Sequence, residues 1–346
     1  MEELTTNTLQ PFVRDYLQKT GERVVGLERI FFGKNNRSYH VRTQGRSYFL
    51  KAYFRHPQDT RDRLGAEYTF LEFCRGQGIS GVPLPLACDR TSGVALYSWV
   101  DGAPVKKERI SREDIYSAAA LLSALARCSA APQAAELPLA SDACTSAWDH
   151  LLLAQRRVEA LTAALTASQG ISIVQEARNF TVTRLIPALD SAVNRARSLI
   201  APDSLHQPLS PQEFVVSPSD FGFHNALRTR DGMVYVDFEY AGRDDPVKTV
   251  CDFVCQPEIP VEEDSLETMV SALETFDTKK ILQRAKALLP LHRIKWCCIL
   301  LNDFIALHAL RREFSCSQHI DIERLSTQIY KAQCYFDAFA ATLEKH

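Results

Sequence analysis

The pattern of hydrophobic and polar positions divides this chain into a first part rich in strand-forming residues and a second part with helical spacing. Gln44 and Gly45 separate two of the strand-like segments, so we expect a tight turn that makes them antiparallel neighbours. Residues 61–76 carry apolar positions at helical spacing, which predicts one helix among the strands. β-Branched and aromatic residues predict the strands themselves at 24–32, 38–43, 46–54 and 94–100.

Helical spacing of apolar residues dominates the chain from Ser111 onward. We expect Ser111 to cap a helix at residues 114–128, because a serine hydroxyl accepts a hydrogen bond from the first turn of a helix. Strand-forming residues return over 214–238, where apolar arms flank Asp231 and Gly232 and predict a hairpin. Further helical segments are expected at 147–165, 181–200 and 296–301.

A change of composition near residues 97–102 is the clearest boundary along the chain. We therefore predict an α+β fold in two parts. Residues 1–98 are expected to form a lobe with an antiparallel sheet and one helix, and residues 99–346 a larger, mostly helical lobe.

Composition and charge argue against several classes of protein. The net charge of −2 gives no bulk attraction to nucleic acid or to an anionic membrane surface, so we expect neither as a partner. No run approaches the roughly 18 apolar residues of a membrane span, and the first residues lack the apolar core of an export signal. The ten cysteines form no C-x-x-C pair, which favours reduced thiols and a cytoplasmic location. The sequence leaves the oligomeric state open.

Three oxygen-bearing side chains flank the predicted hairpin. Asn225 precedes its first arm and Asp237 ends its second, so antiparallel pairing brings the two within about one residue of facing each other. Asp220 lies on the short loop that leads into the hairpin. Carboxylates and an amide oxygen suit Mg²⁺, which also takes phosphate oxygens of a substrate as ligands. The sequence therefore predicts a magnesium site at this end of the hairpin.

The same set of side chains has the composition that phosphoryl transfer needs. A metal stabilises the charge of the transferred group, and a separate carboxylate takes the proton of the acceptor hydroxyl. Asp220 fits the base, while Asn225 and Asp237 fit the metal. The alternative is purely structural, with Asp220 and Asn225 capping a turn and Asp237 ending a strand.

The spacing from Asp220 to Asn225, followed by Val-Asp-Phe-Glu-Tyr at residues 236–240, resembles the aminoglycoside phosphotransferase and choline kinase superfamily. The pattern of that family is H-x-D-x-x-x-x-N and then an apolar strand ending in I-D-[FW]-E. The resemblance implies a protein-kinase-like, two-lobed fold that uses ATP and Mg²⁺. It implies that Asp220 is the catalytic base and that Asn225 and Asp237 bind Mg²⁺. It further implies a structural role for Asp252.

One lysine, Lys51, lies within a strand that is otherwise apolar and aromatic. A buried ammonium is costly unless it is paired, and Glu67 on the following helix can reach it. The family resemblance implies that this pair holds the lysine against the phosphates of ATP. Glu72 is the less favoured partner. The alternative is a lysine on an edge strand whose amine reaches solvent.

Two further segments resemble nucleotide-binding parts of the family. The turn of residues 33–38, with Asn36 inside it, resembles the hairpin that covers the phosphates. Residues 95–102 resemble the hinge between the lobes, which implies that backbone groups of Ser98 and Trp99 bind adenine. The alternatives are a plain surface turn for the first segment and a core strand followed by a turn for the second.

Pro218 departs from the family pattern, because it stands where the family has its histidine. That histidine anchors the catalytic loop by hydrogen bonding, and proline cannot. The predicted function is an ATP-dependent phosphotransferase acting on a hydroxyl of a small molecule, such as an amino alcohol, a sugar or an aminoglycoside-like compound. The alternatives are a weak or inactive nucleotide-binding pseudokinase with a regulatory role, and a helical interaction protein whose resemblance is coincidental.

Acidic residues that follow the metal aspartate bear on the acceptor. Glu239, Asp244 and Asp245 would form an acidic rim for a cationic acceptor. We favour the alternative, in which Asp244 and Asp245 cap the next helix and Glu239 is structural. Trp296 and the pair at 302–303 could line the acceptor pocket, although a core position is the favoured interpretation of the tryptophan.

Overall fold

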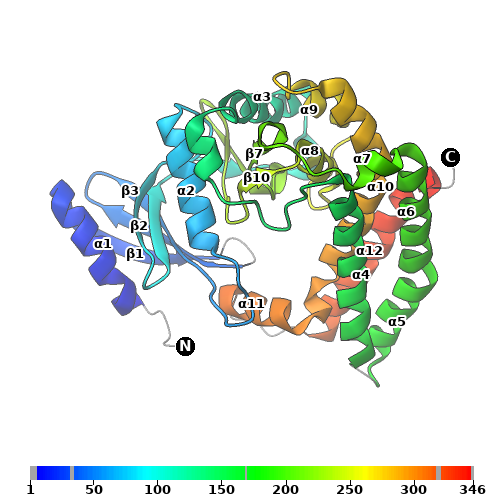
Figure 1. The fold of residues 1–346 in the computed structure, drawn as a ribbon. Helices are drawn as coiled ribbons and strands as arrows, with labels where there is room; N and C mark the ends of the chain where they lie inside the picture. Colours follow the sequence, from blue (N-terminus) through cyan, green and yellow to red (C-terminus); the bar gives the residue numbers. More distant parts are fainter. Residues whose placement is uncertain (1–5, 32–34, 168–169, 317–320, 344–346) are drawn as a thin grey trace.

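The structure is a computed structural model, and it describes residues 6–31, 35–167, 170–316 and 321–343. A sheet with two helices lies at one side of the molecule, and long helices gather at the other side (Figure 1). This is the predicted α+β arrangement. The boundary between residues 98 and 99 stays a prediction.

The first lobe contains a five-stranded antiparallel sheet in the order β1-β2-β3-β5-β4. The predicted strands and the turn at Gln44 and Gly45 are confirmed, with the N–H of Thr43 donating to the carbonyl of Arg46 at 2.9 Å. The bounds are β1 Val24–Ile30, β2 Arg37–Thr43, β3 Ser47–Ala52, β4 Pro85–Asp89 and β5 Val94–Ser98.

Helices cover the two faces of this sheet. Helix α1, Thr6–Thr20, buries Val13 and Leu17 against one face, and α2, Arg63–Gly76, packs on the other (Figure 1). The sequence pattern missed α1 and the edge strand β4. Pro85 begins β4, and an edge position tolerates proline because a missing N–H costs little there.

Five short strands form two small sheets after the first lobe. The predicted hairpin is confirmed, with Leu227 opposite Val234 and Arg228 opposite Met233. One small sheet has the order β6-β8-β9 and another pairs β10 with β7. The bounds are β6 Ala103–Pro104, β7 Val215–Ser217, β8 Ala226–Thr229, β9 Gly232–Tyr235 and β10 Gly242–Asp244.

The larger lobe is helical, with α10 at its centre. Ser111 caps α3 as predicted, and Asp114 completes a capping box. The helix expected at 181–200 begins earlier, because a π-turn at Thr181–Leu185 joins α5 to α6. The bounds are α3 Arg112–Cys128, α4 Ala147–Ala167, α5 Ser172–Phe180, α6 Ile186–Leu199, α7 Pro202–His206, α8 Pro246–Cys255, α9 Ser265–Ser271, α10 Thr278–Leu300, α11 Ala306–Cys316 and α12 Ile322–Leu343.

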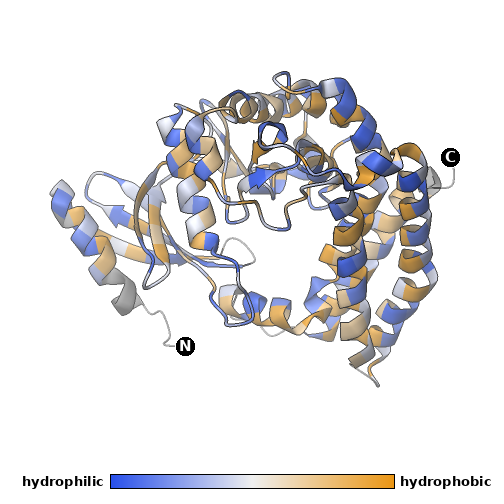
Figure 2. Cartoon of the chain, in the orientation of Figure 1, coloured by the Kyte–Doolittle hydropathy of each residue, from blue (hydrophilic) through white to orange (hydrophobic). Residues whose placement is uncertain are grey.

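Hydrophobic and hydrophilic residues alternate along the visible helices, as expected for amphipathic helices that bury one side (Figure 2). Leu288 and Ile294 of α10 are completely buried in the main core. Within the described residues, no helix is both long enough and apolar enough to cross a membrane. Short 3₁₀ turns lie at Lys107–Arg109, Pro132–Glu136, Pro211–Glu213, Phe223–Asn225 and Asn302–Phe304.

Candidate active site

Lys51 lies where the two lobes meet. Strand alternation places it on the same face of β3 as Phe49, away from α1, because successive side chains point to opposite faces. Its Nζ lies 2.6 Å from Oε2 of Glu67 and 2.5 Å from Oδ1 of Asp237. Burial opposes the charged form, but Asp237, Glu67 and Glu239 together raise the pKa of Lys51, so the ammonium is retained.

Glu67 connects helix α2 to the loop that carries Asp237. Its Oε1 accepts the N–H of Phe238 at 3.2 Å, and its Oε2 accepts the hydroxyl of Tyr53 at 2.6 Å. The ring of Phe70 stacks on the ring of Phe238 with centroids 4.7 Å apart. The less favoured partner, Glu72, is 45% exposed at its side chain and pairs with Arg75 instead. The structure therefore brings Glu67, rather than Glu72, to the lysine.

The loop before the hairpin brings Asp220 and Asn225 together. Nδ2 of Asn225 donates to the backbone carbonyl of Asp220 at 3.0 Å. The N–H of Val236 donates to the carbonyl of Asn225 at 2.8 Å, so Asp237 lies one residue beyond the facing position, as predicted. The Asp220 carboxylate lies 3.3 Å from Nε2 of His224.

Two residues of this region have left-handed backbone. Ser219 has a φ of 63° and Asp237 a φ of 68°. Such a conformation costs about 1–3 kcal/mol for a residue other than glycine, and residues of this kind cluster at functional sites. Burial raises the pKa of the Asp237 carboxyl, and Glu67 and Asp220 act in the same direction, while Lys51 opposes them.

The donor set fits a magnesium ion that also binds phosphate. Oδ1 of Asp237 faces Lys51, whereas no described residue donates a hydrogen bond to its Oδ2. The amide nitrogen of Asn225 is engaged by Asp220, which leaves the amide oxygen as a ligand. The described residues contain no group of three His, Cys, Asp or Glu side chains able to hold a metal on their own. Mg²⁺ commonly needs only one or two protein ligands when phosphate supplies the others.

A pocket of about 220 Å³ lies between the sheet and the hairpin. Lys51, Glu67 and Asp237 stand at its polar end, and its other walls are mainly apolar. Such a cavity suits a flat ring with a charged tail. Beyond the hinge segment, the sequence pattern did not single out the apolar wall, which includes Ile30, Phe49, Leu71, Pro83, Leu227 and Val236.

Asn36 lines the pocket, but its amide is engaged within the protein. Its nitrogen donates to the Glu239 carboxylate, and its oxygen accepts the N–H of Phe54 at 3.0 Å. The neighbouring Asn35 donates to the other oxygen of Glu239 at 2.6 Å. Residues 33 and 34 of the predicted phosphate cover lie outside the described residues. A nucleotide role of Asn36 stays a prediction.

Ser98 and Trp99 also line the pocket. The N–H of Ser98 donates to the carbonyl of Leu84 at 2.9 Å, and its hydroxyl accepts the N–H of Leu84 at 2.9 Å. The ring of Trp99 stacks on His40 with centroids 3.9 Å apart. Because the N–H of Ser98 is engaged, adenine would have to bind other backbone groups of this segment, and the predicted hinge stays untested.

The sequence of residues 27–255, well over half of the chain, matches the family described as Phosphotransferase enzyme family. The chain belongs to this family. This phosphotransferase-family protein matches no curated protein by sequence.

Solved structures share the fold over nearly the whole phosphotransferase chain. A choline kinase from Cryptosporidium parvum is 12% identical with a TM-score of 0.57, covering 96% of this chain and 97% of its own. A spectinomycin phosphotransferase in complex with ADP and spectinomycin is 11% identical with a TM-score of 0.60, covering 94% of this chain and 98% of its own. A choline/ethanolamine kinase family protein from Mesorhizobium loti is 15% identical with a TM-score of 0.54, covering 92% and 91%. These likenesses show the predicted two-lobed, kinase-like fold.

Hydroxyl groups anchor the loop of this phosphotransferase where Pro218 replaces the histidine. The hydroxyl of Ser217 accepts the N–H of Ser219 at 3.1 Å. Thr249 of α8 donates its own hydroxyl to Ser217 at 2.8 Å. Both Ser217 and Thr249 are buried. The pair therefore connects the loop before Asp220 to a core helix.

We predict that Thr249→Val lowers kcat about tenfold, because losing a buried hydrogen bond costs about 1–2 kcal/mol and frees the loop. The affinity for ATP should stay unchanged, since Thr249 lies outside the nucleotide pocket. Steady-state kinetics and nucleotide titration measure both quantities. Thr249→Ser keeps the hydroxyl and serves as the matched control. A Thr249→Val variant with wild-type kcat would contradict the anchoring role.

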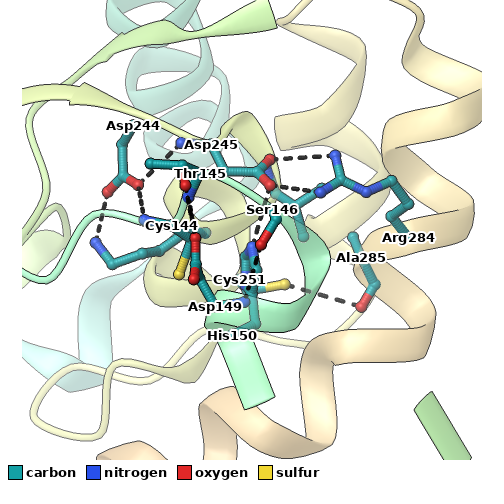
Figure 3. A network of polar contacts seen from close by, with 12 residues as sticks. Cys144, Thr145, Ser146, Asp149, His150, Asp244, Asp245, Cys251, Arg284 and Ala285 are labelled. Carbon is teal, nitrogen blue, oxygen red and sulfur yellow. Dashed lines mark hydrogen bonds and ion pairs between the residues drawn. The ribbon is translucent and has the colours of Figure 1, made fainter. Parts of the chain in front are cut away.

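The less favoured interpretation of these acids as an acidic rim is wrong, because the structure buries Asp244 and Asp245 completely. Asp245 caps α8 as the favoured interpretation predicted, and it also binds His150 at 3.1 Å and Arg284 at 2.5 Å (Figure 3). Asp244 pairs with Lys248 at 2.6 Å. These carboxylates are neutralised within the core of the phosphotransferase and cannot attract a cationic acceptor.

Two other candidate acceptor residues, Trp296 and Asp303, form contacts within the protein as well. Trp296 is 8% exposed and donates its Nε1 to Asp252 at 3.2 Å, which confirms its core position. His292 also binds Asp252, at 3.0 Å, so Asp252 has the structural role that the family resemblance implied. Asp303 pairs with Arg324 at 2.7 Å. The described cysteines are free.

Proposed function

We propose that this protein is an ATP- and Mg²⁺-dependent phosphotransferase that acts on a hydroxyl of a small molecule in the cytoplasm. The observation that carries the proposal is the contact of Lys51 with both Glu67 and Asp237 in one pocket. That arrangement places one cation among carboxylates, where a triphosphate can bind the ammonium and a metal can bind Asp237. The ADP bound to the spectinomycin phosphotransferase supports nucleotide use by this fold.

The chemistry follows from the roles of the side chains. The acceptor hydroxyl oxygen attacks the γ-phosphorus, the bond to the β–γ bridging oxygen breaks, and ADP leaves with the electron pair. Asp220 accepts the proton of the hydroxyl. Lys51 binds phosphate oxygens of the nucleotide. Asp237 and Asn225 would hold Mg²⁺, which when bound neutralises charge on the phosphate oxygens.

The pseudokinase alternative also requires nucleotide binding, so it differs from the proposed kinase only in the absence of phosphoryl transfer. The five polar groups of the site, Lys51, Glu67, Asp220, Asn225 and Asp237, are all present. The contact between Ser217 and Thr249 supports an ordered catalytic loop despite Pro218. Binding of ATP without transfer to water or to any hydroxyl compound would favour the pseudokinase.

We predict that ATP binds more tightly with Mg²⁺ than with EDTA. Asp237→Asn should reduce this magnesium-dependent increase in ATP affinity by about tenfold or more. Isothermal titration calorimetry measures both affinities. Asp231→Asn changes an exposed aspartate of the same hairpin and is the matched control. An ATP affinity that ignores Mg²⁺ in the wild-type protein would overturn the proposal. A screen for ADP release with hydroxyl compounds then tests the transfer step.

A further inference from the structure

Four arginines gather beside the candidate active site, and we name them the arginine cluster: Arg61, Arg63, Arg157 and Arg311. They come from the start of α2, from α4 and from α11, which lies close to the loop that precedes α2 (Figure 1). Packing of Phe54 on Phe314, with ring centroids 5.5 Å apart, holds α11 against the first lobe.

Tyr240 connects the arginine cluster to the reaction centre. It follows Asp237 by three residues, and its hydroxyl accepts Nη1 of Arg311 at 3.2 Å and Nδ2 of Asn35 at 3.1 Å. Asn35 also lines the nucleotide pocket. The guanidinium carbons of Arg63 and Arg61 lie 5.4 Å and 5.8 Å from the centre of the Tyr240 ring. The cluster therefore adjoins the place where a phosphoryl group would be transferred.

Nearby carboxylates form ion pairs with three of the four arginines. Arg63 binds Asp59 at 2.8 Å, while Arg61 and Arg157 share Asp142. A further acid, Glu239, lies 3.6 Å from Nε of Arg63, but Asn35 and Asn36 also hold it and it adjoins Lys51.

Arg311 is the exception, because no described carboxylate lies within ion-pair distance of it. The residue is only 3% exposed. Burial and the four arginines hold the pKa of His308 down, to about 3, so this neighbour of Arg311 is neutral and adds no counter-charge. A buried cation without an anion is unfavourable, so an external anion would stabilise the site.

Hydrogen-bond donors of the cluster also lack acceptors. Nε of Arg311 is buried without a hydrogen-bond partner, as are Nε and Nη1 of Arg63, which is 2% exposed. Buried donors of this kind are rare unless a ligand or water completes them. Of the four arginines, Arg61 lines a cavity of about 360 Å³, whose wall also includes Glu239 and Ala241, the neighbours of Tyr240. A small ligand therefore has space at the Arg61 edge of the cluster.

We propose that the arginine cluster binds an anionic group, phosphate or carboxylate, on the acceptor whose hydroxyl is phosphorylated. This inference rests on the proposed function and names its substrate class. Arginine suits both anions because its planar fork binds two oxygens at once. A cationic acceptor, as in the choline kinases that share this fold, would place a second positive charge against Arg311. An anionic acceptor is the opposite of what the less favoured acidic rim would have implied.

The test is calorimetric titration of the full chain, saturated with ADP and Mg²⁺, with inorganic phosphate and separately with sodium acetate. Bound ADP keeps either anion away from Lys51, and the two arms distinguish phosphate from carboxylate recognition. We expect one of the anions to bind, and Arg311→Gln to raise its Kd by about tenfold to a hundredfold. The Kd of Arg311→Lys should lie between those of the wild-type protein and Arg311→Gln. Arg312→Gln, next in the helix and paired with Asp303, is the matched control and should bind as wild type.

Binding of neither anion by the wild-type protein, or equal binding by Arg311→Gln, would overturn the inference. If Arg311→Gln does not fold, Arg61→Gln at the more exposed edge of the cluster replaces it, with the same direction of change expected. A protein that does not bind ADP refutes the proposed function, while the anion titration still reports on the cluster. In a turnover assay, kcat/KM should be higher with glycerol 3-phosphate and glycerate as acceptors than with glycerol, choline or ethanolamine. A higher kcat/KM with the cationic compounds would also refute the inference.

Discussion

Replacing Asp220 with asparagine is expected to lower kcat by about three orders of magnitude, because an amide cannot take the proton of the acceptor hydroxyl. The affinity for ATP and Mg²⁺ should be preserved. Asn225 binds the backbone carbonyl of Asp220 rather than its carboxylate, so the substitution leaves the loop contact in place. The size of the side chain is also unchanged.

The measurement is ADP release under saturating ATP, with an acceptor or with water as the slow acceptor. Asp203→Asn changes an exposed aspartate of α7 and should behave as wild type. If Asp220→Asn retains wild-type turnover, the base is a different group. His224 would then be the first candidate, because its Nε2 lies 3.3 Å from the Asp220 carboxylate.

Replacing Lys51 with methionine is expected to lower the free energy of unfolding by about 3 kcal/mol or more at neutral pH and to abolish tight ATP binding. The ammonium is the shared partner of Glu67 and Asp237, and the side chains of Lys51 and Glu67 are each only 5% exposed. Methionine keeps much of the volume but leaves both carboxylates without a cation. The loss therefore exceeds that of an ordinary surface substitution.

The pH dependence of this loss has a definite sign. Burial already raises the pKa of Asp237 in the folded protein, and Lys51 is the group that opposes the rise. Without the lysine, the folded-state pKa moves further above the unfolded value of 3.8. Stability is then fully present below the unfolded pKa and is lost as the pH rises through the folded pKa. The difference between the variant and wild type should shrink on acidification.

Guanidinium chloride denaturation at several pH values between about 5 and 8 measures this difference. Lys280→Met removes an exposed lysine that pairs with Glu213, so we expect its effect to stay within about 0.5 kcal/mol at every pH. A difference for Lys51→Met that grows on acidification would contradict the assigned ion-pair network.

Local signals in the sequence predicted much of the fold. The cap at Ser111 and the turns at Gln44 and Asp231 depend on neighbouring residues alone, so their elements appear close to the predicted bounds. Helix α1 and strand β4 were missed. Both depend on long-range packing, since α1 is held by the buried face of the sheet and β4 by pairing with β5.

Charge compensation was the main feature that the sequence could not resolve. Asp245 and Arg284 are 39 positions apart in the chain, yet they form one buried ion pair. Seen along the sequence, Asp244 and Asp245 allow either an acidic rim for a ligand or caps of the next helix. In the folded protein, both are enclosed with their own partners. The exposure of a carboxylate and its pairing with a cation depend on how the chain packs, so they cannot be derived from composition.

The sequence by itself determined which groups are candidates for the chemistry of the site. They are one lysine in an apolar strand, a helical glutamate, and the acids and amide spaced from Asp220 to Asp237. Local patterning places these groups on short elements, so neighbouring residues suffice to find them. Only the tertiary structure decided that Arg61 and Arg311 converge beside Tyr240 and that Arg157 shares Asp142 with Arg61. Those arginines come from three distant helices or their flanks, and each is unremarkable in its own segment. Their meeting depends on how the lobes pack, which no local pattern encodes.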